Sequence, residues 1–409
     1  MFSPHQRMYF VGFLLDAALA VAMTAMPFFV YKQLGGAEAM SGFFGGFAGA
    51  GYAVTCIILA RFVSRADNIL HWAAAGMGIY TALFIAILSS RNPWICGTLY
   101  TLAFCSMALV WPALHAWIGS DPDPDQRKRH TGWFNVAWSL GMSAGPLLAG
   151  PLIDWHYGLS FIAVVLLTLS SLLLLLTLPH ENRHFARATE EQLDARQAHD
   201  RLSEAHLVSA WCATLTVNSL MGLARNVFPK RVDDLVASGQ LRFFAEDTVS
   251  SLLTANAATK FSWLAFVVTL ASAGAFLAAG HTTRWRHNFT WLAFMQMASG
   301  GAFWYLGHTC SLVGMLLAFA VFGAASGQVF FASLTYSLAD PARKHGRATM
   351  NEAMVGAGGF VGSIVAGSAV SYWGFERPFQ WMPVCILSAV LLQWGLLIYG
   401  RRKTSAAHS

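Results

Sequence analysis

Three ionisable side chains lie inside long apolar runs of this 409-residue chain, where their neighbours cannot hydrate a charge. Asp16 lies within VGFLLDAALAVAMTAMP (11–27), and no other Asp, Glu, Lys or Arg occurs between Arg7 and Lys32. Lys260 and Arg225 lie in two later apolar runs. Charged groups at membrane depth are costly, and they commonly mark pathways for protons, ions or charged solutes. The three residues therefore predict binding of a proton or of a charged solute.

The composition predicts the elements that must hold these groups. Hydrophobic residues make up 56% of the chain and charged residues only 11%, whereas soluble proteins average roughly 25% charged residues. Continuous runs of about 20 apolar residues, enough to cross ~30 Å of hydrocarbon as a helix, recur twelve times. Because the runs do not alternate in polarity, they exclude a β-barrel and predict an all-α, polytopic membrane protein. The twelve predicted spans are 8–31, 40–63, 69–90, 94–118, 132–153, 158–178, 207–228, 249–279, 289–307, 311–337, 348–373 and 380–399.

The distribution of basic residues predicts the orientation. Twelve spans place both termini on one side, and that side collects eighteen of the 26 Lys and Arg residues, against six on the other. Basic loops face the cytoplasm, so both termini are expected there, in a bacterial inner membrane. This topology also accounts for the net charge of +6 without a nucleic-acid partner.

The long polar segment 179–206 divides the spans into an N-terminal set (1–178) and a C-terminal set (207–409). We interpret this segment as a solvated cytoplasmic linker, and a regulatory helix is the alternative. The two sets resemble each other: GMSAGPLLAG (141–150) matches GFVGSIVAG (359–367), and Gly141, Gly145 and Gly150 are each followed 217 residues later by Gly358, Gly362 and Gly367. Such a repeat predicts two pseudo-symmetric six-helix bundles.

These features together resemble the major facilitator superfamily of secondary transporters. The resemblance rests on the six-plus-six spans, the Gly-x-x-x-Gly-Pro pattern at Gly141, Gly145 and Pro146, and the basic loops. It implies alternating access, gating roles for the Gly-Pro motif and for Arg61 and Arg65, and a drug or metabolite exporter that exchanges solute for protons. The loop ARFVSRADN departs from the family pattern, with Ser64 where the family has aspartate. Close packing alone also explains the glycines.

Asp16 and Lys260 are both expected near the midplane, where they could pair across the two halves. Asp16 lies nine residues after Arg7, about 14 Å along a helix, on a stripe with Gly12, Ala20 and Met23. The alternatives are a proton site on Asp16, an anion-binding charge on Lys260, or a static salt bridge.

Further polar and aromatic side chains are candidates for the wall of a central cavity, which the resemblance places among spans one, four, seven and ten. Aromatic, Met and scattered polar groups suit a small, partly apolar organic solute, although helix packing explains the aromatics equally well. Arg225 could instead snorkel, and His115 could be a proton relay or a packing residue. The candidates are Asn218 and Arg225 in span seven, Trp111 and His115 in span four, and Gln328 in span ten.

Asn351 and Glu352 open span eleven near its cytoplasmic end. Glu352 could bond the basic loops when a cytoplasmic gate shuts, or could only favour the helix N-terminus. On the opposite side, 229–248 is expected to be a solvated loop, with a surface helix or lid as the alternative.

No nucleotide-binding or hydrolase motif occurs, and the six cysteines lie singly in apolar runs, so we expect neither an enzyme, a cofactor nor a metal site. The leading prediction is a monomeric secondary transporter in contact with membrane lipid, exporting its solute by proton-coupled alternating access. The alternatives are uptake or facilitated passage of an organic anion, a receptor or scaffold that has kept the fold, and a lipid translocase.

Overall fold

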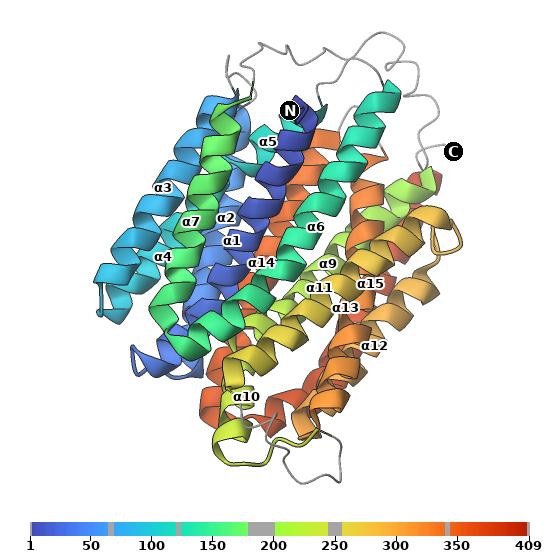
Figure 1. Ribbon diagram of the computed structural model, residues 1–409. Coiled ribbons are helices and arrows are strands. Elements are labelled where there is room, and N and C mark those ends of the chain that lie inside the picture. Colours follow the sequence, from blue (N-terminus) through green and yellow to red (C-terminus); the bar gives the residue numbers. More distant parts are fainter. Residues whose placement is uncertain are drawn as a thin grey trace.

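The computed structural model describes residues 2–63, 69–119, 124–178, 201–243, 256–339 and 344–406. Within these ranges the chain is a bundle of long helices (Figure 1). The helices are α1 (Pro4–Lys32), α2 (Glu38–Val63), α3 (Ile69–Ser89), α4 (Pro93–Met107), α5 (Trp111–Gly119), α6 (Pro124–Trp155), α7 (Tyr157–Leu176), α9 (Arg201–Asn226), α10 (Phe228–Ala237), α11 (Ala257–His281), α12 (Phe289–His308), α13 (Leu312–Leu338), α14 (Lys344–Trp373) and α15 (Glu376–Ala406).

Eleven helical segments of the described chain are long and apolar enough to cross a membrane. The remaining predicted span, 289–307, corresponds to α12, which has 20 residues, about 30 Å at 1.5 Å per residue, but is less apolar. One reason is Gln296, which is fully buried and exchanges two hydrogen bonds of 2.8 Å with Gln393 of α15. The predicted all-α, twelve-span class is therefore confirmed.

The Gln296–Gln393 pair gives a prediction about stability. Gln296→Leu alone should lower the free energy of unfolding by about 1–3 kcal/mol, because Gln393 loses the amide that satisfies it in a buried position. The double variant with Gln393→Leu should recover most of that loss, since both polar groups are then gone. Thermal unfolding in detergent checks this, and a double variant less stable than the single one would contradict it.

The fourth span is broken into α4 and α5, which the hydropathy of 94–118 did not predict. Pro112 explains the break, because it has no N–H and its ring clashes with the carbonyl four residues earlier, that of Ala108. The chain makes a turn at 108–110 and restarts at Trp111. The break sets the direction in which Trp111 and His115 project.

The expected loop at 229–248 is wrong for its first part, where the alternative of a surface helix holds. α10 follows α9 directly and buries Phe228, Pro229, Val232 and Leu235 against the bundle. This apolar side anchors the helix, and its other side carries charged residues.

α9 begins at Arg201, six residues before the predicted start of the second half, and 179–200 lies outside the described residues.

Following the division that the sequence predicts, α1–α7 are called the first half and α9–α15 the second half. α6 packs on α1 of its own half and on α11 of the other, while α14 packs on α9 of its own half and on α2 of the other. α1 begins and α15 ends at one end of the bundle, here called the terminal end; α10 lies at the opposite end, here called the α10 end (Figure 1). This agrees with an even number of spans.

α1 is the most enclosed helix among the described spans. In its most apolar window 83% of the residues are buried, against 22–61% in the other spans. A helix that is apolar all round is expected to be surrounded by protein. Asp16 is therefore held in the interior of the bundle, on the least exposed of the described spans.

Candidate functional site

A cavity lies between the two halves, with about 440 Å³ of empty space, adjoining solvent included. Its wall is formed by α1, α6, α9, α11 and α13, and it is mostly apolar, with three methionines. The lining residues are Ala20, Met23, Thr24, Met142, Pro146, Met221, Ala224, Arg225, Phe261, Ala265, Val268, Thr269 and Phe319. A mostly apolar wall with a few polar groups is typical in composition of a site for a small organic molecule.

Arg225 is the charged member of this wall. It lies in the last turn of α9 and reaches across the midline, where its Nη1 is 3.5 Å from the Met23 sulfur of α1. It also interacts electrostatically with Tyr100 of α4. The structure therefore places this predicted residue in the cavity rather than at a lipid-facing position.

Asp16 lies one and two turns along α1 from two residues of the cavity wall, Ala20 and Met23. It is only 6% exposed, and its Oδ2 has no hydrogen-bond partner among the described residues. The phenols of Tyr52 on α2 and Tyr80 on α3 are its electrostatic neighbours. The Tyr80 hydroxyl is also buried without a hydrogen bond among the described residues. Such unsatisfied buried groups need a functional or solvent-based explanation.

A second carboxylate, Glu352 of α14, approaches this region from the other half. α2 and α14 run antiparallel with glycines in contact, and Gly49 and Ala53 face Gly356, which places Glu352 one turn further, beside Tyr52 and Cys56. Tyr52 interacts electrostatically with Cys56, Glu352 and Asp16. One carboxylate from each half thus flanks one tyrosine.

The predicted Asp16–Lys260 pair does not form. Because α11 begins at Ala257, Lys260 lies in its first turn at the α10 end, not near the midplane. It is buried, and its acidic neighbour is Asp154 of α6. The apolar run starting at 249 misplaced the beginning of the helix, and with it the depth of the lysine.

In span four, the rings of Trp111 and His115 lie side by side along α5, with centroids 6.2 Å apart and planes tilted by 41°. His115 is exposed, although it packs edge-on against the fully buried Phe134 of α6. Phe134 in turn fills the space beside Gly12 of α1. His115 therefore lies beside α6, outside the wall of the cavity described above.

Two other predicted wall residues face elsewhere. The Asn218 amide donates to Thr214 of its own helix at 2.9 Å, and its Cβ packs on Gly358 of α14. Gln328 is 7% exposed and lines a smaller pocket inside the second half, with Trp285, Leu292 and Tyr336, rather than the central cavity. The direction in which Gln328 faces depends on how α13 is rotated about its axis, and the hydropathy of the sequence does not reveal that rotation.

The repeated glycines make the close contacts that their spacing predicts. A Cβ on Gly141 would overlap the Phe13 carbonyl of α1, and one on Gly145 would lie 2.5 Å from the Ala20 Cβ. The equivalent Gly358 and Gly362 meet Leu215 and Ser219 of α9 in the same way.

The third glycine of each set packs across the halves. Gly150 meets α11 at Thr259 and Ser262, and Gly367 meets the start of α2. The repeated glycines therefore make corresponding close helix–helix contacts in both halves. Pro146 remains inside α6 and lines the cavity.

The halves are joined at the α10 end. The Asn226 carbonyl, one residue after Arg225, accepts hydrogen bonds from Tyr31 at 2.7 Å and from Ser41 at 2.6 Å. Within the second half, the Asn226 amide also donates to Ser363 of α14 at 2.9 Å. Asp154 of α6 accepts from the backbone N–H of Thr259 at 2.9 Å and from its hydroxyl at 2.5 Å. None of these contacts has a signal that the sequence alone would reveal.

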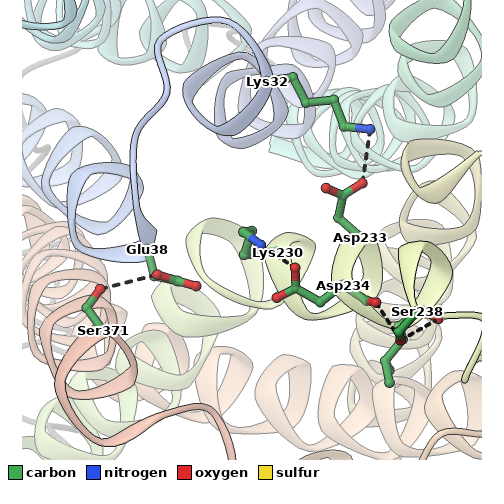
Figure 2. Close-up of polar contacts among 8 residues, drawn as sticks. Lys32, Glu38, Lys230, Asp233, Asp234, Ser238 and Ser371 are labelled. Carbon is green, nitrogen blue, oxygen red and sulfur yellow. Dashed lines mark hydrogen bonds and ion pairs between the residues drawn. The ribbon is translucent and has the colours of Figure 1, made fainter.

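Figure 2 shows the outermost layer of this closure, where α10 contributes an ion pair. Lys32, at the end of α1, lies 2.9 Å from Asp233 of α10. Nearby, Ser371 of α14 donates to Glu38 of α2 at 3.3 Å. The ion pair connects α10 of the second half to α1 of the first.

The Lys32–Asp233 pair should contribute little. Its side chains are 47% and 23% exposed, and such pairs contribute at most about 1 kcal/mol. Lys32→Ala should therefore change the ratio of closed to open molecules at the α10 end by no more than about fivefold. Distance distributions between labels across this end check it, and complete opening would show that the ion pair, not the hydrogen bonds around Asn226, holds the closure.

At the terminal end, hydrogen bonds and an ion pair join helices within each half. In the first half Tyr9 hydrogen-bonds His130. In the second, Asn351 accepts from Ser333 at 2.6 Å and Arg347 pairs with Glu204 at 2.6 Å. Asn351 thus supports its own half rather than a gate between halves in this state. The side chain of Arg61 and all of Arg65 lie outside the described residues.

Comparisons with known proteins agree with this architecture. The structure matches that of the nucleoside transporter NupG with a TM-score of 0.76, at 13% identity, covering 97% of this chain and 99% of that chain. It matches the peptide transporter POT in complex with sulfate with a TM-score of 0.74, at 12% identity, covering 98% of this chain and 95% of that one.

A third match is a bacterial homologue of the human lysosomal transporter Spinster, in an inward-facing and unoccupied conformation, with a TM-score of 0.69 at 13% identity, covering 98% of this chain and 97% of that one. At such identities the likeness shows the fold alone. No curated protein matches the sequence. The family model of the Major Facilitator Superfamily matches residues 8–228, more than half of the chain. This protein therefore belongs to the major facilitator superfamily of secondary transporters, which move small solutes across membranes.

Proposed function

We propose that this transporter is a proton-coupled exporter of a small, partly apolar organic solute, with Asp16 as its proton site. The solute binds in the central cavity between α1, α6, α9 and α11. The terminal end faces the cytoplasm, so the state described here is closed to the outside by the contacts around Asn226. The two halves, 1–178 and 207–409, rock about the cavity and expose it to each side in turn.

The burial of Asp16, without a hydrogen bond to Oδ2 or a cationic partner among the described residues, is the observation that carries the proposal. A charge at such depth costs from about 2.5 to more than 10 kcal/mol. Protonation removes that cost. The free energy of enclosing Asp16 therefore depends on whether it carries a proton, and this dependence couples the proton to the conformational change.

The apolar wall with its three methionines supports a solute with an apolar body, because a sugar needs many paired polar groups. The Gly-x-x-x-Gly-Pro motif supports export, since the family's exporters carry it at this place in span five. In this chain Gly141 and Gly145 seat α6 directly on α1, the helix of Asp16. Movement of α6 is thereby transmitted to the proton site.

Flux measurements at opposed proton gradients test the proposal. Purified protein in liposomes is offered a panel of small organic solutes, and mass spectrometry follows their movement with the lumen at pH 6 or at pH 8. We expect at least one solute whose net flux reverses or changes severalfold with the gradient. Flux of solutes that is the same under both gradients would contradict proton coupling, and no flux of any kind would favour a receptor or scaffold.

A further inference from the structure

We propose that the transported solute carries a single negative charge that binds Arg225, and that this anion moves together with the proton of Asp16. The inference rests on the proposed proton coupling and adds the class of substrate. It also specifies the stoichiometry: one monoanion, such as a carboxylate or sulfonate with an apolar body, and one proton cross in the same direction. Export then follows the outward gradient of the solute.

The charge of the cavity wall favours an anionic ligand. Arg225 is the charged residue among those that line the cavity, and the remaining lining residues are apolar apart from two threonines. An enclosed cation needs a counter-ion, because an unpaired charge in a low-dielectric interior is strongly unfavourable. No acidic side chain of the described residues forms an ion pair with Arg225. A bound anion would supply the missing charge.

The hydrogen-bonding capacity of Arg225 exceeds what the described protein atoms use. A guanidinium has five N–H donors in a planar fork that matches carboxylate or sulfonate oxygens. Its described hydrogen bond is to the Met23 sulfur at 3.5 Å, and a thioether is a weak acceptor. Tyr100 adds an electrostatic contact from α4. The fork thus retains donors for a ligand positioned between α1, α4 and α9.

The position of Arg225 directly before the closure links ligand binding to gating. Asn226 is the residue whose carbonyl and amide join α9 to α1, α2 and α14. A ligand bound to Arg225 that also contacts α1 connects the two halves on the cavity side of the contacts around Asn226. Binding of the anion and closure at the α10 end are therefore linked through adjacent residues of one helix.

The proton site and the anion site share one interior. Met23 follows Asp16 by two helical turns, about 10 Å along α1. When both sites are empty, the pair formed by Arg225 and Asp16 has no net charge, and with both anion and proton bound it again has none. With only one of them bound, a net charge must be enclosed. The halves should rock with both ligands or with neither.

The tyrosines near these sites do not change the net charge of the Arg225–Asp16 pair. Tyr52 and Tyr80 face Asp16 as neutral phenols, and Tyr100 faces Arg225 in the same form. Glu352 is half-buried, lies nearer the terminal end, and is outside the wall of the cavity described above.

Three probes of matched shape test the proposal: benzenesulfonate (anion), benzenesulfonamide (neutral) and benzyltrimethylammonium (cation). Binding is followed by the thermal stability of the purified protein. Proton movement is followed by the dye pyranine in the lumen of proteoliposomes when a probe is added outside. Cotransport acidifies the lumen, exchange makes it alkaline, and neither sign depends on the orientation of the protein.

We expect benzenesulfonate alone to raise Tm and to acidify the lumen. Arg225→Gln should weaken its binding at least about tenfold, since removing one partner of an enclosed charge pair is costly, and Arg225→Lys should recover part of it. Arg377→Gln, which removes an exposed arginine at the start of α15, is the matched control and should bind normally.

The outcomes separate this inference from the proposed function. If the neutral or cationic probe drives proton movement and benzenesulfonate does not, the substrate class is wrong and proton coupling stands. If benzenesulfonate binds through Arg225 but moves no protons, proton coupling fails and the anion site stands. Binding of benzenesulfonate that is unchanged in Arg225→Gln, or alkalinisation of the lumen, overturns the inference.

Discussion

The Asp16→Asn variant should insert and fold, yet lose proton-linked transport. Asparagine keeps the shape of the side chain but cannot bind or release a proton, so the cost of enclosing position 16 no longer depends on pH. Proton movement with any transported solute should fall at least about tenfold, equivalent to about 1.4 kcal/mol. Tm should not fall, because the substitution removes a carboxylate whose Oδ2 is unsatisfied.

Lumenal pyranine fluorescence and thermal unfolding measure the two effects together. Glu376→Gln, which neutralises an exposed carboxylate at the start of α15, is the matched control and should keep both properties. Full proton movement in Asp16→Asn would remove this residue from the mechanism and leave Glu352 as the remaining candidate. A variant that fails to fold would be replaced by Asp16→Glu, which should retain coupling with an altered pH profile.

The Gly42→Leu variant should hold the α10 end open. Gly42 lies in the second turn of α2, and a Cβ there would overlap the carbonyl oxygen of Ser363 on α14, in the other half. Overpacking of this kind costs about 1–3 kcal/mol, and the cost applies to the closed state. The population open at the α10 end should therefore rise by about 5- to 150-fold, and transport should be lost.

Labelling of a cysteine at position 24 (Thr24→Cys, in the cavity wall) checks this prediction in a chain without its six native cysteines. A membrane-impermeant maleimide added outside should react faster when Gly42→Leu is present. Gly395→Leu, at an exposed glycine where an added Cβ meets nothing within 4 Å, should leave the rate unchanged. An unchanged rate in Gly42→Leu would show that α2 and α14 do not form part of the outer closure.

The sequence predicted the features that depend on pattern and period. Runs of apolar residues correctly predicted the helical class, and the glycine spacing correctly predicted close contacts with a neighbouring backbone, as at Gly141. Of the predicted stripe, Ala20 and Met23 line the cavity, because residues three apart on a helix share a face, whereas Asp16 lies beside Tyr52 and Tyr80. These properties are local to one helix or are repeated along the chain.

Features that depend on how one helix is rotated or shifted against another were not predictable. Lys260 was misplaced because an apolar run does not reveal where its helix begins. Gln328 was assigned to the central cavity, whereas α13 turns it toward a pocket of its own half. Asn226, Tyr52 and Asp154 were missed because the first two carry no charge and the third lies at a helix end.

Distances across both ends of the bundle test the rocking of the two halves most directly. Spin labels at Gln33 and Gln240 span the α10 end, and labels at Gln126 and Thr283 span the terminal end; all four residues are exposed. A change from pH 8 to pH 5, with benzenesulfonate present, should change the populations so that one pair lengthens as the other shortens. The same change should be absent in Asp16→Asn. Two pairs that stay fixed, or that lengthen together, would contradict a pair of halves rocking about an enclosed proton site.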